Sequence, residues 1–210
     1  MLIGIFGGTF DPIHEGHLHV ARYLLQHLPL DSVRIIPCFS PVHRNQPVAS
    51  AEDRLSMIKQ ATERDTNIIV DTREIDRAGP SYMIDTLTDL QQEFPKDTLC
   101  LILGDDAFEK FDRWHRWREI ITLCNVIVVH RPSTDPHYTP ALQAFMQEHQ
   151  RFEKSSLSQS TSGGIYYCDL PPMPISATEI REQLAHHENN IKGLPPAVDD
   201  YIIKHKLYDD

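Results

Sequence analysis

The chain has 210 residues, of which 40% are hydrophobic and 24% are charged. This balance is typical of soluble globular proteins and excludes a disordered or collagen-like chain. Twenty Lys and Arg side chains against thirty Asp and Glu give a formal net charge of −10. Broad binding to nucleic acids or anionic membranes needs a basic surface, so the charge argues against both. A small anionic ligand in a locally basic pocket remains compatible with it.

No apolar run approaches the roughly 20 residues that a membrane span needs. The first residues, MLIGIFGG, lack the basic stretch that begins a signal peptide. We therefore expect a cytoplasmic protein with no membrane or nucleic-acid partner, and the sequence indicates no particular oligomeric state. Its cysteines are widely spaced and form no C-x-x-C pair, which argues against a zinc site or a disulfide framework: Cys38, Cys100, Cys124 and Cys168.

Short β-branched apolar runs alternate with segments of helical periodicity. The runs have the length of buried strands and lie at Leu2–Phe6, Val33–Pro37, Asn67–Asp71, Leu99–Leu103, Asn125–Val129 and Ile165–Cys168. Helices are predicted over residues 16–28, 52–64, 82–94, 117–123 and 139–150, with Ser50 and Ser81 as N-caps. The alternation predicts an α/β fold with a Rossmann-like, doubly wound parallel sheet. Ligands of such sheets bind beyond the carboxyl ends of the strands.

The pattern changes after Val129. Residues 154–164 (KSSLSQSTSGG) are polar and predict a flexible surface excursion. Helical spacing returns over residues 176–184 and 197–205. We expect a single domain over residues 1–210 with a C-terminal helical extension from about residue 170.

The segment GGTFDPIHEGH, residues 7–17, leads from the first predicted strand into the first helix. Gly7 and Gly8 allow a sharp turn and a close approach of a ligand to the backbone, and a helix N-terminus attracts anions. His14 and His17 flank Gly16, so both imidazoles can donate to one phosphate group. The glycines alone fit a tight turn, and the histidines alone fit a metal site. Since no third or fourth ligand lies nearby, we expect phosphate contact and no protein-held metal.

A second candidate phosphate element lies in ISATEIR, residues 175–181. Ser176 and Glu179 have the S-x-x-E spacing of a capping box, which by itself fits a well-capped surface helix. The hydroxyls of Ser176 and Thr178 lie on the first turn, whose free amides attract anions. Arg181 follows within one further turn and can fork onto phosphate oxygens.

Gly104, Asp105 and Asp106 follow a buried run, at the strand end where α/β sheets hold ligands. Paired carboxylates fit a metal site, an acid–base site or a helix cap. We expect Asp105 to be structural or solvent-facing and Asp106 to belong to the site.

Two tryptophans and a basic loop complete the candidates. We expect Trp117 in the core and Trp114 to stack on a ligand ring, whereas nucleic-acid stacking is disfavoured on an acidic protein. His43 and Arg44 lie on a proline-flanked loop that suits an anion clamp, or is an ordinary solvated loop.

Together, G-G-T-F-D-P-I-H-x-G-H resembles the signature of the nucleotidylyltransferase superfamily, whose H-x-G-H is shared with class I aminoacyl-tRNA synthetases. Further stretches resemble bacterial nicotinate-nucleotide adenylyltransferases, and they span nearly the whole chain in the expected order: P-V-H-R at 41–44, G-P-S-Y at 79–82 with Thr86-Leu87, and ISATEIR. The chain departs from many of these relatives at Cys38 and Phe39, where they carry Asn nearby, and at Met83, where several carry Thr.

The resemblance implies transfer of AMP from ATP to nicotinate mononucleotide, giving deamido-NAD and pyrophosphate in NAD biosynthesis. ATP is then a co-substrate, and Mg²⁺ is bound through its phosphates. The catalytic residues it implies are His14, His17 and Arg181. The ATP contacts it implies are Gly7, Gly8, Thr9, Phe10, Gly16, Gly104, Asp106, Arg131, Ser176 and Thr178. Its contacts for nicotinate mononucleotide are His43, Arg44, Tyr82, Trp114 and His115.

The implied chemistry is an in-line displacement at phosphorus that depends on positioning and charge neutralisation. The nearest alternative acceptor is nicotinamide mononucleotide, alone or beside the acid, and phosphopantetheine is less favoured. A non-catalytic nucleotide-binding regulator is the alternative of another class. A fragment of an aminoacyl-tRNA synthetase is disfavoured because the chain lacks a K-M-S-K-S-like loop and a basic surface.

Overall fold

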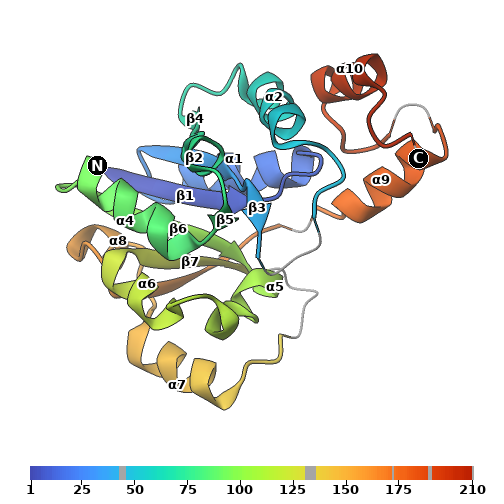
Figure 1. Cartoon of the computed structure of the whole chain (residues 1–210). Coiled ribbons are helices and arrows are strands. Elements are labelled where there is room, and N and C mark those ends of the chain that lie inside the picture. The colour runs from blue at the N-terminus through green and yellow to red at the C-terminus, as the bar shows by residue number, and fades with distance from the viewer. Residues whose placement is uncertain (43–45, 131–135, 172, 189–190, 210) are drawn as a thin grey trace.

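A parallel sheet with helices on both faces forms the centre of the protein in the computed structural model, which describes residues 1–42, 46–130, 136–171, 173–188 and 191–209 (Figure 1). The strands of the main sheet are β1 (Leu2–Gly8), β2 (Ser32–Pro37), β4 (Ile68–Val70), β6 (Thr98–Gly104), β7 (Asn125–His130), β8 (Gln150–Arg151) and β9 (Ile165–Asp169). A second, small sheet joins β3 (Ser40–Pro41) to β5 (Pro80–Ser81).

The strand order of the main sheet is β4-β2-β1-β6-β7-β9-β8, and each of its pairings within the described residues is parallel. The chain runs outward from β1 to β4 and then returns to the other side of β1 with β6. The strand order therefore reverses between β1 and β6. In doubly wound sheets the crevice at this reversal, beyond the carboxyl ends of the strands, holds the ligand.

The helices are α1 (Glu15–His27), α2 (Ala51–Thr62), α3 (Arg73–Arg77), α4 (Met83–Glu93), α5 (Asp105–Phe108), α6 (Trp117–Leu123), α7 (Pro140–His149), α8 (Ser156–Gln159), α9 (Ala177–Ala185) and α10 (Pro196–His205), with a 3₁₀ turn η1 (Phe111–Arg113). Successive strand residues point to opposite faces, so the sheet separates two apolar clusters. One cluster packs against α4, α6 and α7, and the other against α1, α2, α9 and α10 (Figure 1). The predicted doubly wound α/β fold is thereby confirmed.

The C-terminal helices extend the face formed by α2. Val198 and Ile202 of α10 are buried in the same cluster as Met57 and Ile58 of α2. The predicted helical extension is therefore packed onto the fold. No helix in the described ranges is long and apolar enough to cross a membrane.

The N-cap predictions have different outcomes. Ser50 caps α2, accepting the Asp53 backbone N–H at 3.0 Å. Ser81 is not an N-cap, because it belongs to strand β5 and α4 begins two residues later with Tyr82 as its N-cap. The Ser81 hydroxyl instead accepts the Phe39 N–H at 3.0 Å, so it joins the loops after β2 and α3.

The predicted flexible excursion over residues 154–164 is partly wrong. It contains the short helix α8, whose Leu157 is buried in the core. A single apolar side chain among serines gives no periodicity, which is why the sequence pattern missed the helix.

Candidate active site

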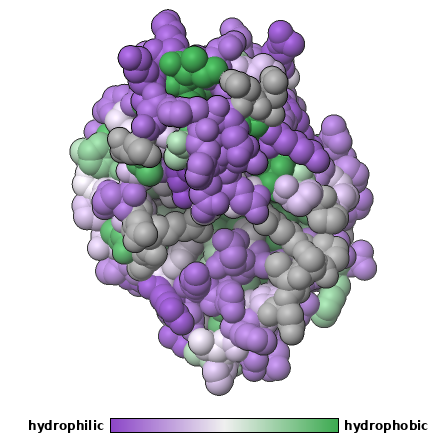
Figure 2. Space-filling view, turned by 90° about the vertical axis from the view of Figure 1, so that its right-hand side faces the viewer, coloured by the Kyte–Doolittle hydropathy of each residue, from purple (hydrophilic) through white to green (hydrophobic). Residues whose placement is uncertain are grey.

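The first loop leaves β1 at the carboxyl edge of the sheet. A Cβ at Gly7 would lie 2.6 Å from the Met83 methyl carbon, and one at Gly8 would lie 2.9 Å from the Phe10 ring. The Met83 methyl is the end of a flexible side chain and can move aside, whereas the Phe10 ring, which is buried, leaves little room for a side chain at Gly8. The side of the molecule towards which these strands run faces the viewer in Figure 2, and its coloured surface is mainly hydrophilic, which suits a charged ligand.

His14 and His17 lie against each other at the start of α1. Their rings stack with centroids 3.7 Å apart, and the Phe10 ring packs edge-on against His17 at 5.0 Å. The His14 backbone N–H donates to Nδ1 of His17 at 3.3 Å. Because Nδ1 accepts, a neutral His17 carries its proton on Nε2, where it can donate to a ligand. The two imidazoles thus lie side by side, as predicted.

Arg181 of α9 reaches this loop from 170 positions away. Its Nη1 donates to the carbonyl oxygen of Asp11 at 2.6 Å, and its Nη2 donates to Thr178 Oγ1 at 3.4 Å. A second link joins Glu15, whose N–H donates to the carbonyl of Gly193 at 2.8 Å. A Cβ on Gly16 would lie 3.7 Å from Ile175. The N-terminal ends of α1 and α9 therefore lie close together, as the family resemblance implied.

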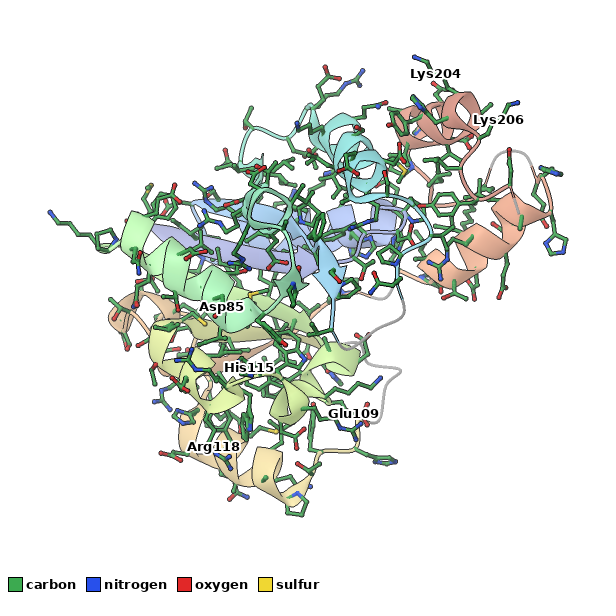
Figure 3. The ribbon with its side chains drawn as sticks, in the orientation of Figure 1. Asp85, Glu109, His115, Arg118, Lys204 and Lys206 are labelled. Atoms are coloured by element: carbon green, nitrogen blue, oxygen red, sulfur yellow. The ribbon has the colours of Figure 1, made fainter. Side chains whose placement is uncertain are left out.

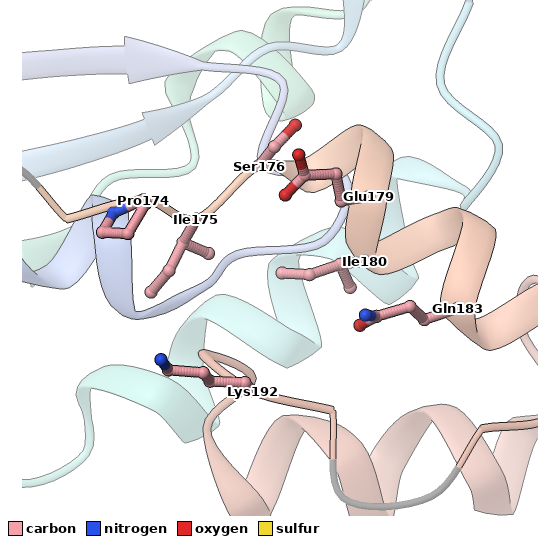
Figure 4. Close-up of a pocket in the computed structure, with 7 residues that line it drawn as sticks. All are labelled: Pro174, Ile175, Ser176, Glu179, Ile180, Gln183 and Lys192. Carbon is pink, nitrogen blue, oxygen red and sulfur yellow. The ribbon is translucent and has the colours of Figure 1, made fainter. Parts of the chain in front are cut away.

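The capping box that the spacing of Ser176 and Glu179 left open as an alternative does not form. Ser176 is the N-cap residue of α9, but its side chain makes no capping hydrogen bond. Both side chains line a cavity of about 150 Å³ instead (Figure 4). Its other lining residues are Pro174, Ile175, Ile180, Gln183 and Lys192. Thr178 and Arg181 do not line it, whereas Ile175, which lies next to Gly16, does.

The two aspartates after β6 have different environments. Asp105 is 3% exposed, and its Oδ2 lies 3.1 Å from Nδ1 of His130 at the end of β7. Asp105 is therefore structural, and the solvent-facing alternative is wrong because α5 turns its side chain inward. Asp106 is exposed next to Gly104, where a Cβ would lie 2.9 Å from its Oδ1. It is the more exposed of the two carboxylates at this strand end.

Three of the residues implied for the mononucleotide lie near one another. Tyr82 and His115 have ring centroids 4.7 Å apart, and His115 is exposed below α4 (Figure 3). Trp114 is half-buried with its ring 5.5 Å from Phe111. Trp117 is buried in the apolar cluster beneath them, which confirms its predicted core position. His43, Arg44 and Arg131 lie outside the described residues.

Arg54 is a buried cation that sequence reasoning missed. It is 1% exposed, and its guanidinium donates to the carbonyls of Thr9 and Cys38 at 2.7 Å each and of Ala49 at 3.3 Å. It thus joins the loops that follow β1 and β2. The signal was its position with Met57 and Ile58 in the core-facing stripe of α2, where an arginine needs buried acceptors.

Cys38 and Glu74 lie buried beside these loops. Burial raises the pKa of the Cys38 thiol, although the nearby Arg54 opposes the shift. The thiol is therefore protonated and a poor nucleophile. Burial likewise raises the pKa of Glu74, against a 2.6 Å hydrogen bond from the Thr86 hydroxyl. Within the described ranges no cluster of three or more His, Cys, Asp or Glu side chains could hold a metal ion.

Comparison with known proteins matches residues 5–183 to the model of the cytidylyltransferase-like family. A protein of Methylococcus capsulatus named "Probable nicotinate-nucleotide adenylyltransferase" is 40% identical over 99% of both chains. One of the same name from Coxiella burnetii is 43% identical over 99% of this chain and 98% of its own.

A solved structure shares the fold at lower identity. It is the Plasmodium falciparum nicotinic acid mononucleotide adenylyltransferase complexed with NaAD, with a TM-score of 0.75 and 19% identity. The match covers 99% of this chain and 97% of the other. At this identity the likeness supports the arrangement of strands and helices and no individual contact.

Proposed function

Since this chain belongs to the nicotinate-nucleotide adenylyltransferase family of cytidylyltransferase-like proteins, we propose that it transfers AMP from ATP to nicotinate mononucleotide. The products are deamido-NAD and pyrophosphate, and the reaction belongs to NAD biosynthesis. One observation carries the proposal: His14, His17 and Arg181 converge on a single loop at the carboxyl edge of the sheet.

The reaction is an in-line displacement. An oxygen of the mononucleotide's 5′-phosphate attacks the α-phosphorus of ATP, and the bond from that phosphorus to the bridging oxygen of pyrophosphate breaks. The attacking phosphate is already ionised at neutral pH, so no side chain has to remove a proton. The protein contributes positioning and neutralisation of charge on the phosphoryl oxygens.

We assign the phosphate contacts to the two helix N-termini. Nε2–H of His17 and the imidazole of His14 donate to phosphoryl oxygens, and Arg181 contacts the β- and γ-phosphates. The remaining contacts proposed for ATP are Gly7, Gly8, Thr9, Phe10, Gly16, Gly104, Asp106, Arg131, Ser176 and Thr178.

For the mononucleotide we propose a second pocket between α4 and α6. The Trp114 ring stacks on the pyridine, while the His115 amide and Tyr82 contact its carboxylate side. His43 and Arg44 contact its phosphate.

We propose that Mg²⁺ arrives on the triphosphate, because the described residues offer no ligand cluster of their own. When bound, the ion neutralises phosphate charge. Since both substrates are small water-soluble nucleotides, we also propose a cytoplasmic location.

The experiment that tests the function is a pyrophosphate-release assay with ATP and either nicotinate or nicotinamide mononucleotide. We expect release with the acid at a rate at least about tenfold above that with the amide, since mismatched polar groups stay unpaired. Equal rates would contradict the preference for the acid. Such a loss of preference would be in line with Met83, which stands where several relatives carry Thr. ATP binding without any pyrophosphate release would support a regulator instead.

A further inference from the structure

The carboxylate of Asp11 is a buried junction between distant parts of the chain. Asp11 is 7% exposed. Its Oδ2 accepts the Val48 N–H at 2.8 Å, and its Oδ1 accepts the Ala49 N–H at 3.1 Å and the Tyr208 hydroxyl at 2.6 Å. All three donors are neutral groups. A buried carboxylate depends on such bonds, since each replaces part of the hydration that it lost.

Tyr208 contributes this bond from near the end of the chain, 197 positions from Asp11. Its ring is 6% exposed and packs in the cluster formed with α2 and α10. Burial and the hydrogen bond to Asp11 raise the pKa of Tyr208 far above its usual range. The hydroxyl therefore stays protonated and donates throughout the neutral range.

The backbone of Asp11 connects this junction to the candidate site. Its carbonyl accepts Nη1 of Arg181 at 2.6 Å. His14 follows three residues later, and its ring stacks on His17. A shift of Asp11 would thus move the acceptor of Arg181 and the start of α1 together.

We propose that Tyr208 is a positioning residue for phosphoryl transfer, acting through Asp11 on the placement of Arg181 and His14. The inference rests on the proposed function, and it assigns the C-terminal segment a part in aligning the phosphate-binding groups. When the groups that align the reacting atoms are slightly misplaced, kcat falls. The affinity for a substrate that is bound by other residues changes less.

The variant that tests this is Tyr208→Phe, which removes the hydroxyl and keeps the buried ring. Its matched control is Tyr201→Phe, because the Tyr201 hydroxyl also bonds a carboxylate, Asp53 at 3.0 Å, but one outside the first loop. We expect kcat for pyrophosphate release to fall about tenfold in Tyr208→Phe, with KM for nicotinate mononucleotide changed by less than about twofold. Tyr201→Phe should keep both constants within about twofold of the parent protein.

A double-mutant cycle tests whether Tyr208 acts through Asp11. If it does, adding Tyr208→Phe to Asp11→Asn should lower kcat by less than about twofold further. The proposal would be overturned if the two separate losses of kcat multiplied in the double variant. It would also be overturned if kcat were unchanged in Tyr208→Phe.

Hydrogen exchange without substrate separates this inference from the proposed function. Peptides covering residues 7–18 should exchange faster in Tyr208→Phe than in the parent protein and in Tyr201→Phe. Faster exchange with no turnover by the parent protein would contradict the proposed function and support the link between Tyr208 and the loop. Unchanged exchange would overturn the link even if the parent protein is active.

Discussion

His17 is oriented by the loop that precedes its helix: the His14 N–H fixes its tautomer, and the rings of His14 and Phe10 fix its plane. We expect His17→Ala to lower kcat for pyrophosphate release by about 10²–10³, because a donor aimed at developing charge acts mainly in the transition state. His19→Ala is the matched control. His19 lies on the same helix, half-buried beside Tyr23, and its loss should leave kcat within about twofold. Near-normal turnover by His17→Ala with an intact fold would contradict the assigned role.

Arg54 supports a prediction about stability. Arg54→Met should lower the free energy of unfolding by about 3 kcal/mol or more, because the buried carbonyl of Cys38 and the partly buried carbonyl of Thr9 each lose a charged donor. Urea denaturation measures the change. Arg64→Met is the control. Arg64 is exposed two residues after the end of α2, and its replacement should change the free energy of unfolding by no more than about 0.5 kcal/mol. If both substitutions changed the free energy of unfolding equally, the contacts of Arg54 with the two loops would not contribute to stability as predicted.

These residues also show what sequence can and cannot reveal at this scale. His14, His17 and Arg181 were predicted together through the family resemblance, which rests on two short motifs with particular residue types at fixed positions. Arg54 and Tyr208 were missed because their partners are backbone carbonyls and a carboxylate far along the chain. Such pairings follow from the packing of whole helices, which no local pattern contains.

At the scale of elements, the long strands and amphipathic helices were predictable because burial gives them clear apolar runs and periodicity. The strands β3, β5 and β8 have two residues each, and α3 has five. Elements this short show no period and depend on tertiary contacts. At the start of α9 the S-x-x-E spacing does not become a capping box, since the Ser176 side chain makes no capping hydrogen bond.

Asp71 joins three elements and gives a prediction of pH dependence. It follows β4 and accepts hydrogen bonds from Arg34 of β2 at 3.0 Å and from Arg73 of α3 at 2.8 Å. Burial acts to raise the pKa of Asp71, but the bonds from these arginines outweigh it, and the pKa lies below its usual value. The stabilisation is therefore complete above the unfolded-state pKa and is lost as the pH falls through the lower, folded-state pKa.

We expect Asp71→Asn to lower the free energy of unfolding by about 3 kcal/mol at neutral pH, as removal of one partner from a buried ion pair does. The difference from the parent protein should shrink towards about pH 3, measured by urea denaturation at both pH values. Asp89→Asn is the control, because Asp89 pairs with Arg77 at the surface and should cost less than about 1 kcal/mol. A difference independent of pH would contradict the assigned role of the Asp71 charge.

At the scale of the whole molecule, the strand order places the start of α1 at the reversal between β1 and β6, and the C-terminal extension brings α9 to the same edge. The parallel sheet was predictable from the alternation of elements. The position of α9 was predictable only through the family resemblance, because periodicity does not specify where a terminal helix packs. The single-domain organisation stays a prediction. We expect a protein of net charge −10 to bind a triphosphate here through local donors, two helix N-termini and Arg181, because charges farther away are screened.

The most direct test of this convergence is calorimetric titration of ATP into the parent protein and into Arg181→Met. If the first loop and α9 contact the same triphosphate, the affinity should fall by about tenfold or more in Arg181→Met, the loss typical of one charge-assisted phosphate contact. Arg118→Met, which removes a guanidinium lying over Trp117, should leave the affinity unchanged. Parent-like ATP binding by Arg181→Met, with binding weakened in His17→Ala, would contradict the account.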